Sequence, residues 1–269
     1  FIPRALSIIM LATIFSALLG PNIANFNKDL ISGHLFVGSY LSLAVLTSIP
    51  ILFLSFYNSK AESRGAKEHK GRGYFELISQ PKFLQAVASA AFAYAVMSFL
   101  MTATPINMHV IEYYSLNKTG IVIQLHIVSM FLPSLITGNL LRKFGHSKII
   151  YAGVIFFILT ILLSFLQPSF FNYLFSLIFL GIGWNFLYLS GTGLLILSYR
   201  EEEKFKAQGF NDILVFSTQA LASLSAGFVL SITSWKTMNL IAIPFLILIV
   251  FTSIRADKSK QQTNKKFFS

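Results

Sequence analysis

Long hydrophobic runs recur along the whole chain, separated by short polar gaps. Eight of them approach or exceed the ~20 apolar residues that an α-helix needs to cross ~30 Å of hydrocarbon. They cover roughly residues 5–25, 35–57, 83–110, 119–141, 149–167, 170–198, 210–233 and 237–254. The runs lack the two-residue alternation of membrane β-strands, so they are expected to be helices. The pattern predicts an all-α polytopic membrane protein with eight transmembrane helices.

The basic residues gather in alternate gaps between these runs. Of the 21 Lys and Arg residues, 18 fall into one set of gaps, and only Lys28, Lys118 and Lys236 fall into the other. Short cytoplasmic loops retain Lys and Arg, so the rich set is predicted to face the cytoplasm. The split also supports the count of eight, because removing one span would move every later charge to the opposite side. The C-terminus is then cytoplasmic.

One polar connection divides the runs unequally. We expect residues 1–57 to form the last two helices of an N-terminal bundle, followed by a basic cytoplasmic linker over 58–82. A short interfacial helix is predicted within that linker, at 74–79. Residues 83–255 are expected to form a six-helix C-terminal bundle, and 256–269 a disordered cytoplasmic tail.

Composition narrows the classes of partner and chemistry. The net charge of +11 lies in loops between spans, which favours the lipid bilayer and its anionic headgroups over nucleic acid. The chain has no Cys, which excludes disulfides and thiolate metal sites within it. It also lacks the GxxxxGK[ST] and HExxH motifs. We therefore predict no enzyme activity, cofactor or metal.

Two short motifs carry a resemblance to a known family. The loop after the second run beyond the linker reads GNLLRKFGHSK and holds Gly138, Arg142, Lys143, Gly145 and Lys148. It resembles the G-x-x-x-D-R-x-G-R-R gating loop of major facilitator superfamily transporters, with Arg142 at the acidic position. The first run carries Gly20 and Pro21, similar to the helix-packing motif G-x-x-x-G-P-x-x-G-G of antiporters in that superfamily. Ser16, Ala24 and Asn25 replace the other glycines.

The resemblance covers essentially the whole chain and is strongest to an uncharacterised bacterial branch. It implies helices five to twelve of a twelve-helix fold. Because the chain enters its first span after a single Arg4, upstream helices are expected. The resemblance further implies a secondary transporter in the bacterial cytoplasmic membrane, which moves a small organic solute by alternating access. The Gly20–Pro21 match favours proton-coupled efflux, with protons as a second partner.

Polar side chains within the spans are candidates for the solute pathway, because facing lipid is costly. His126 lies near the middle of a span and is interpreted as a substrate contact or proton carrier, or as a buried neutral His bonded between helices. Asp212 is either a helix cap or cytoplasmic gate residue, or a proton-binding site. The other candidates are Gln124, Asn185, Tyr188, Gln219, Met101 and Asn107. For Asn185 and Tyr188 the alternative is bonding to neighbouring helices, and for Met101 it is core packing.

A second hypothesis belongs to a different class of protein. Two helices before the linker do not make a complete bundle, so a non-transporting scaffold, a receptor-like protein or an inactive fragment also fits the sequence. Solute flux into liposomes that contain this chain alone would argue against an inert protein. The sequence does not determine the solute or the oligomeric state.

Overall fold

The computed structural model describes the backbone of residues 2–56 and 71–267 and the side chains of 12, 14–16, 18–56 and 71–262. In these ranges all regular elements are helical. The chain divides into two units, Phe1–His69 and Lys70–Ser269. Residues 58–70 of the predicted linker lie outside the described residues, and its short helix is present as α3, Tyr74–Ile78.

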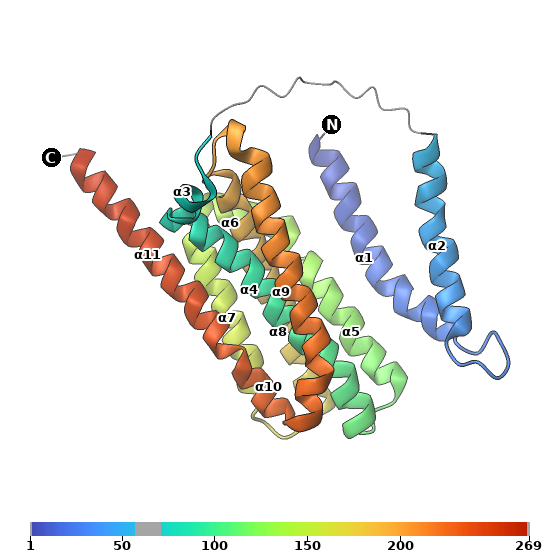
Figure 1. The fold of residues 1–269 in the computed structure, drawn as a ribbon. Helices are drawn as coiled ribbons and strands as arrows, with labels where there is room; N and C mark the ends of the chain where they lie inside the picture. The colour runs from blue at the N-terminus through green and yellow to red at the C-terminus, as the bar shows by residue number, and fades with distance from the viewer. Residues whose placement is uncertain (1, 57–70, 268–269) are drawn as a thin grey trace. The chain divides into compact units, whose positions relative to one another are not determined.

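The first unit holds two helices (Figure 1). They are α1, Ile2–Phe26, and α2, Val37–Ser55. The two are joined near their connection by side-chain hydrogen bonds. Ser39 Oγ donates to the carbonyl of Ala24, and Asn27 Nδ2 donates to Ser42 Oγ at 2.7 Å.

The second unit is a bundle whose long helical stretches follow the predicted spans (Figure 1). Four of these stretches consist of two consecutive helical elements. Its remaining elements are α4 (Pro81–Pro105), η1 (Ile106–Ile111), α5 (Leu116–Phe131), α6 (Ser134–Phe144), α7 (His146–Leu163), α8 (Phe170–Ile196), η2 (Glu201–Glu203), α9 (Lys204–Ile232), α10 (Trp235–Ile241) and α11 (Ile243–Phe267). Among the described residues, seven helical stretches are long and apolar enough to cross a membrane. The eighth predicted span falls in α1, of which Ile14–Phe26 is a shorter apolar helix.

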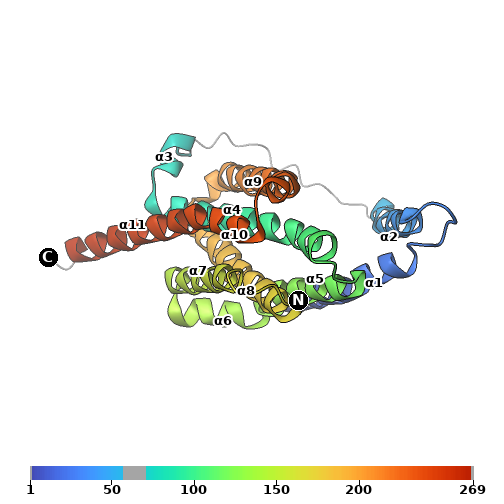
Figure 2. The same ribbon diagram turned by 90° about the horizontal axis from the view of Figure 1, so that it is seen from below.

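Helices α4 and α8 form the centre of the second unit. In an apolar 18-residue window of each candidate span, 78% of the window is buried for the stretch that contains α4 and 61% for α8. The corresponding share is 17–39% for the other candidate spans of this unit. Seen from below, α9 lies on one side of α4, and α7 with α6 lies on the other (Figure 2). Small residues allow the close approach. A Cβ added to Gly191 of α8 would lie 2.7 Å from the carbonyl oxygen of Ala86 on α4.

Two predictions about helix ends differ from the structure. Helix α9 begins at Lys204, so the prediction that Asp212 caps a helix was wrong, and Asp212 lies two turns inside. The tail that was expected to be disordered continues α11 to Phe267. Residues 256–262 are rich in Ala, Lys and Gln, which favour helix, and extending a helix that already exists avoids the cost of nucleation.

Candidate functional site

Three aromatic side chains meet between α4 and α8. The ring centroids of Tyr94, Trp184 and Tyr188 lie 5.0 Å apart in each of the three pairs. Trp184 and Tyr188 are stacked at an interplanar angle of 13°, and Tyr94 stands at 86° to both. A 5.0 Å separation between nearly parallel rings means that the stack is offset, an arrangement that aromatic pairs prefer. We call these three residues the aromatic triangle.

The aromatic triangle lies near the midpoints of its helices, because Tyr94 is central in α4 and Trp184 is central in α8. In spanning helices this is the level of the bilayer centre. Two further rings border it. Phe131 of α5 packs against Trp184 at 5.9 Å, and Phe216 of α9 lies 6.4 Å from Tyr94. Four helices therefore contribute to one aromatic wall.

The triangle contains a buried donor that nothing in the described chain satisfies. Trp184 is 4% exposed, and its Nε1 has no hydrogen-bond partner within the described residues. Tyr94 and Tyr188 are half-buried, and Phe216 is exposed. A buried N–H without an acceptor carries a desolvation cost of about 1–3 kcal/mol. An acceptor supplied from outside the described residues would remove this cost.

One face of α9 places polar groups beside this wall. Asp212, Phe216 and Gln219 follow at the spacing of a single helix face. The Asp212 side chain is exposed, and its charge acts on the nearby phenol of Tyr188. Gln219 is half-buried. The structure therefore brings two of the candidates, Tyr188 and Asp212, to the neighbourhood of the aromatic triangle, and Gln219 follows Phe216 on the same face of α9.

Asn185 is committed to its neighbouring helices. It is 1% exposed, and its Nδ2 donates to the carbonyl of Met130 and to Ser134 Oγ, both at 2.6 Å. Its Oδ1 accepts from Thr137 Oγ1 at 2.7 Å. These bonds surround Pro133, where the span divides into α5 and α6. Asn185 satisfies polar groups at that break, which favours the alternative that it bonds between helices.

His126 is also engaged between helices. It is fully buried, and its Nδ1 donates to the carbonyl of Leu177 on α8 at 2.7 Å. Because a carbonyl only accepts, Nδ1 must carry the hydrogen. Its Nε2 has no partner in the described part of the chain. The bond to Leu177 is what the alternative of a buried neutral His bonded between helices requires. Proton transfer by Nε2 stays a prediction.

The remaining pathway candidates lie at other places. Met101 is half-buried and packs against the hydrophobic core from α4. Asn107 is buried in η1, where its Nδ2 donates to the hydroxyl of Tyr173. Gln124 is half-buried on α5. Core packing thus explains the position of Met101, and the bond to Tyr173 explains the buried polar side chain of Asn107.

The gating loop motif forms the connection between α6 and α7. Gly145 adopts φ 83°, a left-handed value that favours glycine, and lets α7 start directly at His146. Arg142, Lys143 and Lys148 are exposed, and Arg142 Nη2 donates to Oδ1 of Asn139. Nothing lies within 4 Å of a Cβ added to Gly138.

The helix-packing motif lies in the first unit. Gly20 is exposed in α1, with nothing within 4 Å of an added Cβ, and Pro21 lies inside the helix. Asn22 Nδ2 donates to the carbonyl of Leu18 at 2.7 Å. The packing role of Gly20 and Pro21 stays a prediction.

Sequence reasoning missed most of the aromatic wall. Polarity within a span is the signal that points to Asn185 and Gln219, and it does not point to Trp184 or Phe216. The available signal was the position of the aromatic residues in the middle of long apolar runs. Within the described residues, no group of three or more His, Asp or Glu side chains is placed to hold a metal ion.

The sequence of the second unit matches a known protein family. The family model of the Major Facilitator Superfamily matches residues 86–269, which is more than half of the chain. The protein therefore belongs to the Major Facilitator Superfamily. The predicted resemblance to this superfamily is confirmed, and the antiporter character that Gly20 and Pro21 indicate stays a prediction.

Three curated relatives match over most of this chain. The riboflavin transporter RfnT of Brucella anthropi is 34% identical over 259 residues, which are 96% of this chain and 65% of that protein. Two uncharacterised MFS-type transporters of Bacillus subtilis, YddS and YdeG, are each 28% identical over 88% of this chain, and the matches cover 58% and 59% of their lengths. The chain thus spans less than two thirds of the length of the relatives it matches.

Proposed function

We propose that the protein is a secondary transporter that moves a small organic solute across the bacterial cytoplasmic membrane by alternating access. The superfamily supports this class of activity, and the seven candidate spans support insertion in a membrane. In this proposal residues 83–255 form one complete helix bundle, and residues 1–57 belong to the other. The basic loops face the cytoplasm.

The proposed solute carries a planar aromatic ring system of the flavin kind. The observation that carries this proposal is the unpartnered Nε1 of Trp184 within a stacked aromatic triangle at mid-helix. A flavin ring is flat and bears carbonyl groups, so it offers both a stacking surface and an acceptor. A relative at 34% identity, named as a riboflavin transporter, supports the same class of solute.

Riboflavin is expected to bind the chain in lipid nanodiscs and to lose fluorescence as it binds, because indole and phenol rings stacked on a flavin quench its emission. Trp184→Leu should weaken the affinity about 10-fold, since an aromatic stack contributes about 0.5–1.5 kcal/mol. Trp184→Phe keeps a ring but removes the N–H, so its affinity should lie between those of the wild type and Trp184→Leu. Fluorescence titration measures all three dissociation constants.

The chain offers a matched control for this experiment. It has two Trp residues, and the second, Trp235 of α10, packs against Tyr173 at 5.7 Å. Trp235→Leu should leave riboflavin affinity unchanged. Ribitol, which shares the polyol chain of riboflavin but lacks the ring, should not compete. Equal losses in Trp184→Leu and Trp235→Leu, or competition by ribitol, would contradict an aromatic recognition site.

We also propose that export of the solute is coupled to protons. Asp212 is better placed than His126 for this role, because it is exposed beside Tyr188 whereas His126 is buried and bonded to α8. In proteoliposomes, Asp212→Asn should abolish the stimulation of transport by a pH gradient. His126→Gln should mainly lower protein stability. Wild-type pH dependence in Asp212→Asn would remove Asp212 from the coupling mechanism, and the same result in His126→Gln would remove His126.

A further inference from the structure

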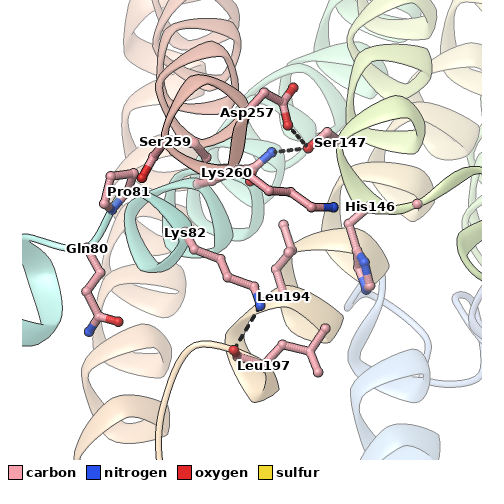
Figure 3. A pocket seen from close by; sticks show the side chains of 13 residues that line it. Gln80, Pro81, Lys82, His146, Ser147, Leu194, Leu197, Asp257, Ser259 and Lys260 are labelled. Atoms are coloured by element: carbon pink, nitrogen blue, oxygen red, sulfur yellow. Dashed lines mark hydrogen bonds between the residues drawn. The ribbon is translucent and has the colours of Figure 1, made fainter. Parts of the chain in front are cut away.

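A cavity of about 570 Å³ opens at the end of the second unit where α4 and α7 begin (Figure 3). The C-terminal parts of α8 and α11 complete its walls. Its titratable lining residues are Lys82 of α4, His146 of α7, and Asp257 and Lys260 of α11. This is the end that carries the predicted cytoplasmic loops, so the cavity lies at the level of the lipid headgroups. We call it the basic cavity.

Two ammonium groups share the basic cavity. Lys82 Nζ donates to the carbonyl of Leu197 at 2.9 Å, which holds the group at the wall. The Lys260 side chain reaches across the cavity towards His146 (Figure 3). The charge of Lys260 acts on both Lys82 and His146. Cations that line one cavity repel one another, and an anion placed between them relieves the repulsion.

The one carboxylate of the basic cavity is turned towards α7. Asp257 Oδ1 accepts from Ser147 Oγ at 2.7 Å, and Oδ2 accepts from the hydroxyl of Tyr151 at 3.1 Å. Ser147 Oγ in turn accepts from Gln85 Nε2 at 3.0 Å. In the described ranges no ion pair joins Asp257 to a lysine of the cavity. The cavity therefore keeps an excess of positive charge.

An apolar groove of about 590 Å³ runs between α7 and α11, lined only by hydrophobic side chains. We call it the α7–α11 groove. Its lining includes Ile158 and Leu162 of α7 and Ile254 of α11, all of them exposed. Ile254 precedes Asp257 of the basic cavity by one helical turn. The α7–α11 groove thus ends next to the basic cavity. A phospholipid likewise has apolar acyl chains joined to a charged phosphate.

We propose that the basic cavity binds the phosphate group of an anionic phospholipid whose acyl chain occupies the α7–α11 groove. A phosphate held by Lys82 and Lys260 supplies the anion that Asp257 does not provide. The adjoining groove favours a lipid over free inorganic phosphate, which has no apolar part to bury. This site is separate from the aromatic triangle, and its occupancy does not depend on the transported solute.

Native mass spectrometry of the detergent-solubilised chain tests the proposal, with phosphatidylglycerol and phosphatidylcholine of the same acyl chains supplied in equal amounts. Phosphatidylglycerol adducts should predominate. The double variant Lys82→Gln/Lys260→Gln should bind phosphatidylglycerol about 30-fold more weakly, because each basic contact with an anionic lipid contributes about 1 kcal/mol. Lys143→Gln/Lys204→Gln removes the same charge from the same end outside the cavity and should bind within about twofold of the wild type.

A second variant separates the lipid from free phosphate. Leu162→Trp fills the α7–α11 groove without touching the cations, and it should weaken phosphatidylglycerol binding as well. Inorganic phosphate at millimolar concentration should not displace the lipid. Equal adducts of the two lipids, or equal losses in the two double variants, would overturn the proposal. Displacement by inorganic phosphate, with no effect of Leu162→Trp, would show that the cavity takes free phosphate and would overturn the lipid assignment.

Discussion

Glu203→Gln is expected to destabilise the second unit by about 3 kcal/mol, because it removes the negative charge from a half-buried ion pair. Glu203 is fully buried, and the Arg72 side chain is 19% exposed. Glu203 Oε1 accepts from the backbone N and the Nε of Arg72, at 2.9 and 2.7 Å. Its Oε2 accepts from Arg72 Nη2 at 2.7 Å and from the backbone N of Arg200 at 2.9 Å.

These bonds attach the chain before α3 to the loop between α8 and α9. The hydrogen bond to Glu203 raises the pKa of Arg72, so the guanidinium stays charged at all accessible pH values. A glutamine amide would replace one acceptor oxygen with a donor that faces the Arg72 N–H groups. The variant therefore loses an acceptor and leaves a half-buried cation without its counter-ion.

Thermal unfolding in detergent measures the effect of Glu203→Gln. A loss of about 3 kcal/mol corresponds to a fall in the unfolding temperature of roughly 6–12 °C for a unit of this size. Glu201→Gln is the matched control, because the Glu201 side chain is 87% exposed and its Oε1 lies 3.9 Å from Lys204 Nζ. A surface ion pair of this kind contributes less than about 1 kcal/mol to stability. If Glu203→Gln and Glu201→Gln unfold at the same temperature, the Arg72–Glu203 pair does not stabilise the unit.

Much of the fold could be predicted from the hydrophobic pattern because the bilayer imposes it. A span must be long, apolar and helical. A single run of sequence such as 149–167 shows these properties without knowledge of the rest of the fold. Helix ends were less predictable. Lys204 starts α9 well before the apolar run, since a first turn that contains Lys204, Lys206 and Ala207 is as able to be helical as the apolar residues that follow it.

The candidate site was predicted less well, for a physical reason. A polar residue inside a span signals either a pathway or an interhelical bond, and the sequence does not distinguish the two. Asn185 makes three bonds around the Pro133 break, which became visible only once α5, α6 and α8 were in place. The aromatic triangle likewise depends on the distance between α4 and α8, which is set by glycine and alanine contacts rather than by any local motif.

Gly181→Ala is expected to destabilise the second unit, because helices α5 and α8 are in close contact at Gly181. A Cβ added to Gly181 would lie 2.0 Å from Ser129 Oγ and 2.7 Å from the carbonyl oxygen of His126. The second of these atoms belongs to the backbone, so the helices would have to move apart. Overpacking of this kind costs about 1–3 kcal/mol, and the backbone contact places Gly181→Ala near the upper end.

The same substitution should also weaken the proposed solute site. Leu177, Gly181 and Asn185 follow one another on the face of α8 that contacts α5 and α6, and Trp184 and Tyr188 occupy the adjoining face. Separation of α5 from α8 would break the bond from His126 to Leu177 and shift Trp184 relative to Tyr94. Gly181→Ala is therefore expected to lower both the unfolding temperature and the affinity for riboflavin.

Gly209→Ala is the matched control for Gly181→Ala. Gly209 lies within α9, and an added Cβ has nothing within 4 Å. In a helix with free space, Gly→Ala stabilises by about 0.5–1 kcal/mol, so the unfolding temperature should rise slightly and riboflavin affinity should stay unchanged. If Gly181→Ala behaves like Gly209→Ala in both measurements, the close contact between α5 and α8 is not what holds the aromatic triangle in place.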